Sequence, residues 1–238
     1  MITVGDAGSE QQRCRASLDA GVTQPRLVTW RYDSPAVVLG RGQPGSAELL
    51  ARAERERLAV VSRASGGGAV MAGPWMLSVT LLLPAVHPLA RASLPAGYRA
   101  VGESCRRALQ RVRVPAESAR DPAAIAVAPP APGDAVHWAC FGNLSHGELE
   151  APGGGKILGI AQVRRRDAIA VCIGVLLGRP DWETLVRVWC GRDDPGIVHE
   201  LERRTASCDR FVPVGGTAFV ESLAAALAAE LPAPGLAA

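Results

Sequence analysis

The sequence predicts an α+β fold in which helices flank a mixed, largely antiparallel sheet. Three observations carry this prediction. Apolar, β-branched segments alternate with segments of helical spacing along the 238 residues. Several successive strand segments are separated by short turns, which join antiparallel neighbours, whereas parallel neighbours need long crossovers. The length of the chain fits one ordinary domain, and the sequence contains no internal repeat.

The first elements are expected to be a helix and a hairpin. Residues 9–20 have the polarity of a helix, with a serine at the start that can cap it. Residues 26–32 are rich in Val, Trp and Tyr, which predicts a strand. Because Asp-Ser-Pro at residues 33–35 is a turn sequence, we expect residues 36–39 to form the second strand of a hairpin.

The middle of the chain predicts two helices and two strands around a glycine loop. Residues 47–58 carry Glu and Arg at helical spacing after a capping serine. Residues 59–63 form a short strand, followed by a glycine loop over residues 65–68. Residues 77–83 are almost entirely apolar and predict a buried strand. A further helix is expected over residues 95–111.

The last part of the chain begins with a Pro/Ala-rich stretch, residues 114–133, which is expected to be the least ordered interior segment. Apolar runs at residues 138–144, 157–164 and 168–177 predict strands. Helices are expected at residues 181–189 and 215–230. We expect residues 1–230 to form a single domain and residues 231–238 a C-terminal tail.

Charge and composition exclude several classes of protein. The chain has 26 basic and 23 acidic residues, a net charge of +3, which is too small for nucleic-acid binding by charge alone. No apolar stretch reaches the roughly 18 residues of a membrane helix. The first ten residues lack the basic and apolar regions of a secretory signal. We therefore expect a cytoplasmic protein with no nucleic-acid or membrane partner.

The cysteines and the lysine content are both informative. Six cysteines are spread along the chain without a CxxC pair or a Cys/His cluster of zinc spacing, so we expect reduced thiols and no metal site. Of the 26 basic residues, 25 are Arg and one is Lys156. Arg can replace Lys on a solvated surface but not where a compact ammonium is needed. Lys156 is therefore a candidate functional residue.

The first of three glycine-rich segments, residues 40–45, matches GxGxxG between a strand and a helix. This is the context of a dinucleotide-binding loop. The preceding hairpin, the missing N–H of Pro44 and the absence of an acidic residue after the next strand argue against it. A dinucleotide-dependent oxidoreductase is accordingly the weakest alternative.

The second and third glycine-rich segments suit an anionic ligand. Three consecutive glycines after Arg63 let successive backbone N–H groups converge on one point, and the guanidinium adds a fixed charge. Lys156 follows three further glycines and precedes a predicted strand, which would hold its ammonium in a defined place. No Ser or Thr follows this lysine, so the segment is not a Walker loop. A point charge here suits a carboxylate or a phosphate.

These segments resemble a known family. Residues 63–70 resemble the Arg-x-Ser-Gly-Gly-Gly-Ala-Val motif of the lipoate–protein ligase A family. Residues 38–43 resemble its Gly-Arg-x-Gln turn, and residues 155–162 resemble its lysine segment. The three motifs occur in the family's order over about residues 37–177. The resemblance implies the catalytic-domain fold of biotin and lipoate protein ligases, without the C-terminal accessory domain of the larger ligases.

The resemblance also implies a chemistry. Such ligases activate lipoate or octanoate with ATP, supplied as its Mg²⁺ complex, to an acyl-adenylate. They then transfer the acyl group to a lysine of a lipoyl-accepting domain, in a 2-oxoacid dehydrogenase or a glycine-cleavage-type protein. The motifs carry over Lys156 as a catalytic residue, whereas Cys140 is a candidate catalytic residue through a separate resemblance described below. The substrate- or nucleotide-binding residues that they carry over are Arg41, Gln43, Arg63, Ser65, Gly66, Gly67, Gly68, Ala69, Val70, Met71, Gly159 and Ala161.

The match departs from the family pattern at three places. Ser62-Arg63 stands where the family has two arginines, Ala72-Gly73 where it has His-Asp, and Cys172-Ile173-Gly174 where a strand ends in His-Gly. These differences motivate a second hypothesis, a protein that binds lipoate or a lipoyl domain without catalysing transfer. The chain also ends soon after the segments that resemble the family, so we expect the function of the accessory domain to come from a separate subunit or to be absent.

Cys140 supports a third hypothesis. Residues 139–149 resemble a segment of cysteine-type octanoyltransferases, in which a thiol takes octanoyl from acyl carrier protein and forms a thioester without ATP. The alternative is that Cys140 is an unreactive thiol buried in the hydrophobic core. The arginine triplet at residues 164–166 falls at a predicted hairpin turn, where it either is simply solvated or helps an acidic carrier domain to dock.

Overall fold

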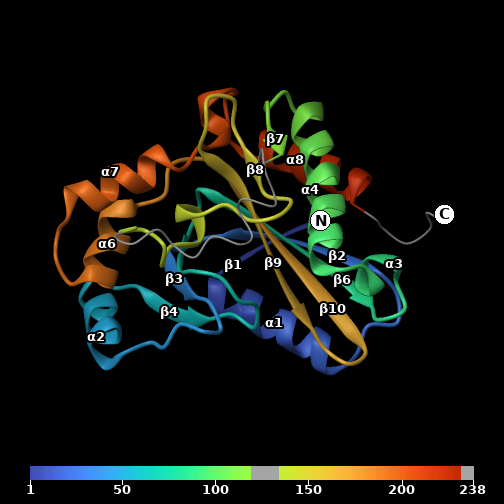
Figure 1. Ribbon diagram of the computed structural model, residues 1–238, viewed down its shortest axis with the longest axis horizontal. Coiled ribbons are helices and arrows are strands. Elements are labelled where there is room, and N and C mark those ends of the chain that lie inside the picture. Colours follow the sequence, from blue (N-terminus) through green and yellow to red (C-terminus); the bar gives the residue numbers. More distant parts are fainter. Residues whose placement is uncertain (119–133, 232–238) are drawn as a thin grey trace.

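The computed structural model describes residues 1–118 and 134–231 (Figure 1). The strands are β1 (Ile2–Gly5), β2 (Arg26–Tyr32), β3 (Ala36–Leu39), β4 (Ala59–Ser62), β5 (Val70–Ala72), β6 (Met76–Pro84), β7 (Glu117–Ser118), β8 (Leu149–Glu150), β9 (Lys156–Arg164) and β10 (Ala168–Leu176). The helices are α1 (Ala7–Asp19), α2 (Ala47–Arg55), α3 (Pro88–Arg91), α4 (Leu94–Arg111), α6 (Trp182–Cys190), α7 (Pro195–Arg203) and α8 (Thr217–Glu230), with 3₁₀ turns η1 (Cys140–Gly142) and η2 (Cys208–Arg210).

Two sheets organise the described residues, and they confirm the predicted α+β class. The larger sheet has the strand order β1-β2-β6-β10-β9-β8-β7, and every pair in it except β1–β2 is antiparallel. The smaller sheet has the order β4-β3-β5, with β3–β4 parallel and β3–β5 antiparallel. The β9–β10 hairpin forms at the predicted turn, and β10 also pairs with β6 along its whole length (Figure 1).

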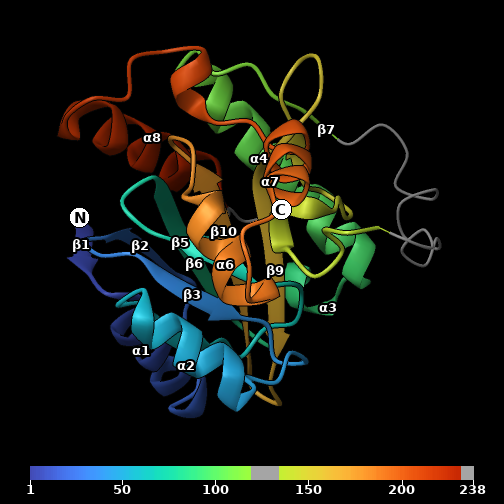
Figure 2. The same ribbon diagram turned by 90° about the vertical axis from the view of Figure 1, so that its left-hand side faces the viewer.

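Helices cover both faces of the larger sheet. Alternate residues of β6 point to opposite faces, so Leu81 and Leu83 join one core with α4 and α8, whereas Leu82 joins another with α1. Figure 2 shows α1 and α8 on opposite sides of the sheet. A third core joins the smaller sheet to α2, α6 and α7. None of the helices in the described part of the chain is both long and apolar enough to cross a membrane.

The predicted hairpin of residues 26–39 is wrong. β2 pairs with β6 and β1, whereas β3 belongs to the smaller sheet and lies between β4 and β5. All four residues of β3 are buried. A strand that is apolar on both faces is stabilised by cover on both sides, which a solvent-facing hairpin does not give.

The predicted strand at residues 138–144 is also wrong. Ala139 makes a single bridge to Ala69, and the chain then turns through η1. Local hydrogen bonds close this turn, from Ala139 N to Val136 O at 3.0 Å and from Gly142 N to Ala139 O at 3.0 Å. Its apolar residues are buried by the turn's packing rather than by a ladder.

Helices α3 and α7 were not predicted. The first turn of α7 holds Pro195 and is capped by Asp194. The remaining predicted helices begin and end within three residues of the observed ones. In the Pro/Ala-rich stretch, residues 119–133 lie outside the described residues. Residues 232–238 of the predicted tail do so as well.

Candidate functional site

A cavity of about 830 Å³ collects the motif residues in one place. Its wall combines the turn after β3, the glycine loop before β5, the turn around η1 and residues of β9 up to Gln162, together with residues of α4 and α6. The predicted site residues that line it are Arg41, Gln43, Arg63, Gly66, Gly67, Gly68, Cys140, Lys156 and Ala161. Segments that are separated by about 115 residues in the sequence therefore meet at one cavity.

Gly68 is required by packing and Gly67 by its backbone conformation, whereas Gly66 is constrained by neither. A Cβ on Gly68 would lie 2.4 Å from the carbonyl oxygen of Trp138, and one on Gly67 would lie 2.7 Å from the Arg63 guanidinium. Gly67 also has a φ of +96°, which favours glycine. A Cβ on Gly66 would meet nothing within 4 Å. The missing side chain at Gly66 therefore leaves space beside the cavity wall that a ligand can fill.

Arg63 organises this loop. Its Nε and Nη2 atoms donate to the carbonyl oxygen of Gly66 at 3.1 and 2.8 Å, and Nη2 also donates to that of Gly68 at 2.8 Å. The side chain is buried although it lines the cavity. We expected the Arg63 guanidinium to bind the ligand. In this structure it instead binds carbonyl oxygens of the glycine loop itself.

Gln43 connects the Gly-Arg-x-Gln turn to the η1 segment. Its Oε1 accepts from Gly40 N at 3.1 Å, and its Nε2 donates to Trp138 O at 2.9 Å. A Cβ on Gly40 would lie 1.8 Å from Gly67 O, so the turn and the glycine loop are in backbone contact. The exposed Arg41 stands beside them at the cavity wall.

Lys156 is the first residue of β9, which begins one residue before the predicted strand, and its ammonium is buried. The Nζ atom donates to Cys140 O at 2.7 Å and Asn143 O at 3.0 Å, and forms an ion pair with Glu148 Oε2 at 2.7 Å. It also lies 5.1 Å from the centre of the Phe141 ring. The ammonium therefore holds both ends of the η1 turn.

Glu148 is the partner that sequence reasoning did not assign a role. It is 3% exposed, and its Oε2 accepts Ser145 N at 2.7 Å besides the lysine. Its Oε1 accepts Ile160 N at 3.0 Å. The sequence does point to Glu148, because this residue belongs to the segment that resembles the octanoyltransferases. Its ion pair with Lys156, however, depends on the fold.

Cys140 lies where two cavities meet. It lines the large cavity and also a second, narrow one of about 70 Å³, and it is half-buried. Its backbone N–H donates to Ala69 O at 2.7 Å, which fixes η1 against the glycine loop. Predicted site residues Val70 and Gly159 line the narrow cavity only. Cys140 thus borders both spaces.

The narrow cavity is lined by apolar side chains around a polar cluster. Glu10 is buried, and its carboxyl accepts hydrogen bonds from Tyr32 at 2.5 Å and from the Ser78 hydroxyl. Burial raises the pKa of the Glu10 carboxyl despite these hydrogen bonds. Cys172, in hydrogen-bond contact with Cys14, also lines this cavity.

The remaining predicted residues lie behind the loop. Ser65, Ala69 and Met71 are each 1% exposed and line neither of these two cavities. In the part of the chain that the structure describes, the Ser65 hydroxyl has no hydrogen-bond partner. Over that same part, no group of three His, Cys, Asp or Glu side chains is arranged to hold a metal ion.

An aromatic wall was not predicted as part of the site. Trp138 and Trp189 stack with their rings 4.7 Å apart and 8° from parallel, and both line the large cavity. Trp189 comes from α6, which was expected only as a packing helix. Flat rings at a cavity wall suit a ligand with a planar group.

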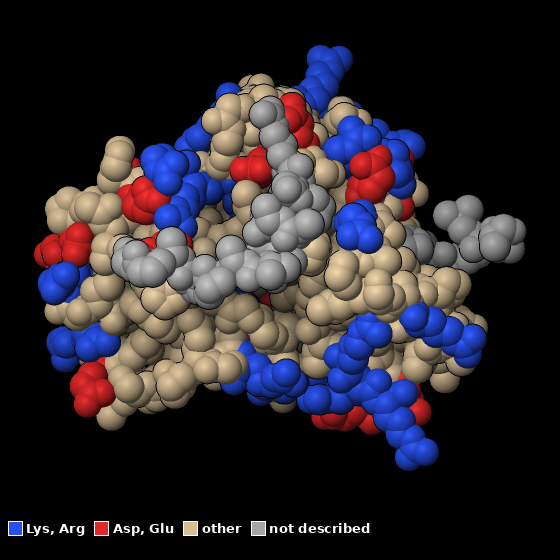
Figure 3. Space-filling view, in the orientation of Figure 1, with Lys and Arg blue, Asp and Glu red and all other residues tan. Residues whose placement is uncertain are grey.

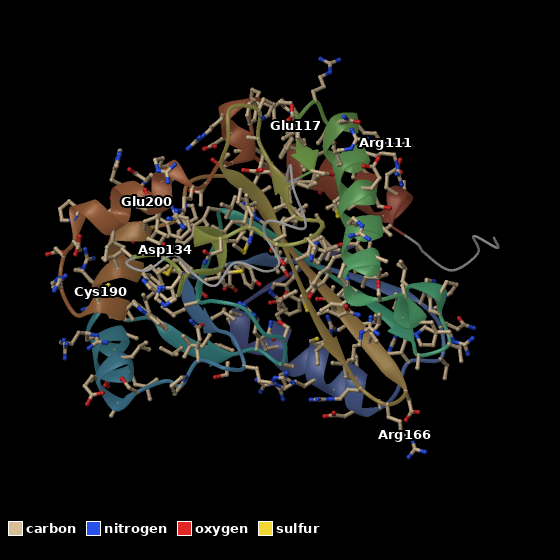
Figure 4. All side chains as sticks on the ribbon, viewed as in Figure 1. Arg111, Glu117, Asp134, Arg166, Cys190 and Glu200 are labelled. Atoms are coloured by element: carbon tan, nitrogen blue, oxygen red, sulfur yellow. The ribbon has the colours of Figure 1, made fainter. Side chains whose placement is uncertain are left out.

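The arginine pairs and triplets divide into structural and solvated groups. Arg204 donates to Asp134 at 3.0 Å, Glu200 at 2.6 Å and Gly142 O at 2.7 Å, so it braces η1 from outside. Figure 4 shows Asp134 and Glu200 close together at α7, and Arg166 pointing into solvent at the β9–β10 turn. Figure 3 shows basic side chains gathered around that turn, at the lower right.

Comparison with known proteins gives a family match. A family model described as the lipoyl protein ligase A/B catalytic domain matches residues 9–228. Curated proteins give no match.

Solved structures give the same fold. A lipoate-protein ligase A bound with ATP matches with a TM-score of 0.69 at 18% identity, covering 97% of this chain and 81% of that chain. A bi-partite lipoate protein ligase, studied with its E2 lipoyl domain from Thermoplasma acidophilum, matches with a TM-score of 0.67 at 16% identity, covering 97% and 82%. LipL1 of P. falciparum in complex with lipoate matches with a TM-score of 0.60 at 13% identity, covering 97% and 61%.

Proposed function

The chain belongs to the lipoyl protein ligase A/B catalytic-domain family, as its motifs predicted, and from that premise we propose that it activates lipoate or octanoate with ATP and transfers the acyl group to a lysine of a lipoyl domain. The observation that carries the proposal is the single 830 Å³ cavity in which the three motifs and the Lys156 ammonium meet. Similar solved structures hold ATP or lipoate, which supports this choice of substrates.

The two cavities suggest how the substrates would divide. The carboxyl group of the acid would lie at Cys140 and Lys156 in the large cavity, and its acyl chain would extend toward the narrow cavity. ATP, as its Mg²⁺ complex, would occupy the large cavity, where Gly66 leaves open space and Arg41 offers a charge for phosphate. The stacked Trp138 and Trp189 offer a flat surface for a purine ring.

The proposed reaction has two steps. A carboxylate oxygen of the acid attacks the α-phosphorus of ATP and releases pyrophosphate. The neutral amine of the acceptor lysine then attacks the acyl carbonyl and releases AMP. Negative charge grows on the oxygens beside Lys156 in both steps, and a buried ammonium stabilises it more strongly than water does. An acyl-adenylate and a lipoylated protein are the products of the first and second step.

One observation favours a second candidate function. Cys140 lies at the junction of the two cavities, where a thiol could take an octanoyl group from the thioester of acyl carrier protein. The thiolate would attack the carbonyl, the carrier thiol would leave with a proton, and the acceptor lysine would then receive the acyl group. This route needs no ATP.

The proposed acceptor is the lipoyl domain of a 2-oxoacid dehydrogenase or a glycine-cleavage-type protein. The T. acidophilum ligase was studied with its E2 lipoyl domain and is bi-partite, which supports both this partner and a separate accessory subunit. We propose that residues 1–230 act as one catalytic domain in that arrangement.

The test is an assay with two arms on the purified protein. One arm contains octanoate, ATP and Mg²⁺ and is examined by mass spectrometry for octanoyl-adenylate. The other contains octanoyl-acyl carrier protein and is examined for a thioester on Cys140. We expect adenylate in the first arm, its loss in Lys156→Ala, and its retention in Cys140→Ser.

The other outcomes separate the alternatives. A thioester without adenylate, abolished by Cys140→Ser, would replace the ligase with the transferase. Binding of octanoate without either product would mean a non-catalytic binding protein. Full activity of Lys156→Ala would contradict the ligase proposal directly.

A further inference from the structure

The Lys156 ammonium has no hydrogen left for a substrate in this state. An ammonium carries three N–H donors. The acceptors are Cys140 O at 2.7 Å, Asn143 O at 3.0 Å and Glu148 Oε2 at 2.7 Å, and the side chain is 2% exposed. A carboxylate or phosphate that binds this lysine must therefore replace one of the three.

Glu148 is the acceptor that a substrate anion resembles. The other two are backbone carbonyls at the two ends of η1, and releasing them would undo the turn that carries Cys140. The carboxylate can give up the lysine and still accept Ser145 N through the same Oε2 atom and Ile160 N through Oε1. It also lines the large cavity, so a ligand has access to the pair.

The residues packed around Lys156 and Glu148 fix the positions of both side chains. A Cβ on Gly159 would lie 3.1 Å from Lys156 Cε, which is tighter than an ordinary contact, so glycine at this position makes room for the lysine side chain. Both charged groups are almost completely buried. Buried ion pairs are weak evidence for stability, so a positional role explains their presence better.

We propose that Glu148 is a positioning residue that acts through Lys156. It holds the ammonium against the η1 turn in the free protein, and the carboxylate of the acyl substrate takes its place on the ammonium when the acid binds. This inference rests on the proposed function, because it needs a carboxylic acid as ligand. Its consequence is that Glu148 opposes binding of the anion, because the two carboxylates compete for one ammonium.

The experiment compares an anionic and a neutral ligand of the same length. Octanoate and octanamide are titrated calorimetrically into the wild-type protein, Glu148→Gln and Glu150→Gln. Glu150 is the matched control, because it is on β8 two residues away and lines a different cavity. We expect Glu148→Gln to bind octanoate about tenfold more tightly, since removing a carboxylate removes like-charge repulsion. Octanamide binding should not change, and Glu150→Gln should change neither.

Separate measurement of KM and kcat provides a second readout. In the transfer assay, Glu148→Gln should lower both the KM for octanoate and kcat, because the anion binds better while the ammonium and the η1 turn are held less firmly. A residue with only a structural role would not improve binding of one ligand selectively.

Several results would overturn the inference. Equal octanoate affinities of wild type and Glu148→Gln, or parallel changes for octanoate and octanamide, would do so while leaving the proposed function intact. Failure of both ligands to bind any variant would instead contradict the proposed function and this inference together. If Glu148→Gln does not fold, a crystal structure of the wild type with octanoate decides. We expect an octanoate oxygen on Lys156 Nζ and a broken pair to Glu148, and an unchanged pair would contradict us.

Discussion

At the scale of single residues, the environment of Lys156 explains why it is the one lysine in a chain with 25 arginines. Its three acceptors surround a compact ammonium at 2.7–3.0 Å, and the neighbouring Gly159 position leaves 3.1 Å to its Cε atom. A planar guanidinium is wider and presents its donors as a fork. Arginine would therefore not fit here, although it serves everywhere on the surface.

Glu10 predicts a pH dependence of stability at the same scale. Burial raises the pKa of this carboxyl above its ordinary value of 4.5. The folded state therefore keeps the proton at pH values where the unfolded chain has lost it. The free energy of unfolding then falls as the pH rises above about 4.5 through the folded pKa, by at most about 1.4 kcal/mol per pH unit.

The variant that tests this is Glu10→Gln, which is neutral at every pH. We expect the wild-type Tm to fall more steeply than that of Glu10→Gln between pH 5 and pH 8, as measured by calorimetry. All other titrating groups are common to both proteins, so their contributions cancel. Parallel pH profiles would show that burial does not raise the pKa of Glu10.

At the scale of elements, the contact between the glycine loop and η1 predicts a contrast between two neighbouring glycines. A Cβ on Gly68 would collide with backbone atoms of residues 138–140, which cannot move aside. We expect Gly68→Ala to lower the free energy of unfolding by about 2–3 kcal/mol, or Tm by about 4–12 °C. Gly66→Ala is the matched control, since its Cβ meets nothing within 4 Å.

Thermal melting and ligand titration together check this contrast. Gly66→Ala should melt like the wild type but bind ATP more weakly, because its methyl group enters the space proposed for the ligand. If Gly66→Ala lost as much stability as Gly68→Ala, the loop would not pack as described. If it bound ATP normally, the nucleotide would lie elsewhere.

Elements with a strong local pattern could be predicted from the sequence, and those set by distant contacts could not. The apolar run of β6 and the capped helix α2 have all their signals within the segment. β3 looks like half of a hairpin because the turn before it is a hairpin sequence. Its membership of another sheet depends on β4 and β5, which come 20 to 36 residues later.

The candidate site divides in the same way. Its motif residues could be identified because glycine loops and an isolated lysine are unusual in themselves. The Glu148 ion pair and the Trp138–Trp189 stack could not, because each joins residues from different elements and their residue types are common. Arg63 was found, but its orientation toward its own loop is a property of the folded backbone.

At the scale of the whole molecule, a basic surface lies beside the large cavity. Arg91, Arg165 and Arg166 are exposed around the β9–β10 turn, where Figure 3 shows the basic side chains gathered. Arg164 holds α3 to this turn through Ala90 O at 2.9 Å and Ala92 O at 3.0 Å. Leu94, Tyr98 and Gln162, close by in sequence, line the cavity. An acidic carrier domain could therefore dock here with its modified residue near the site.

Charge reversal tests this surface. We expect Arg165→Glu/Arg166→Glu to lower kcat/KM for the acceptor domain about tenfold at low salt, with the difference shrinking as salt screens the charges. Arg55→Glu/Arg57→Glu, the same change in net charge on exposed residues near α2, is the control. If the two variants had equal rates and equal salt dependence, Arg165 and Arg166 would be solvated residues without a role in docking.

The central position of β10 has a consequence for the order in which the protein can assemble during synthesis. β10 pairs with β6 along its whole length, yet it follows β6 by about 84 residues. A ribosome adding roughly 5–20 residues per second leaves the apolar β6 without this partner for about 4–17 s. During that interval β6 lacks one of its two strand partners, because β10 has not yet been synthesised. The nascent chain is therefore a candidate for chaperone binding until β10 pairs with β6.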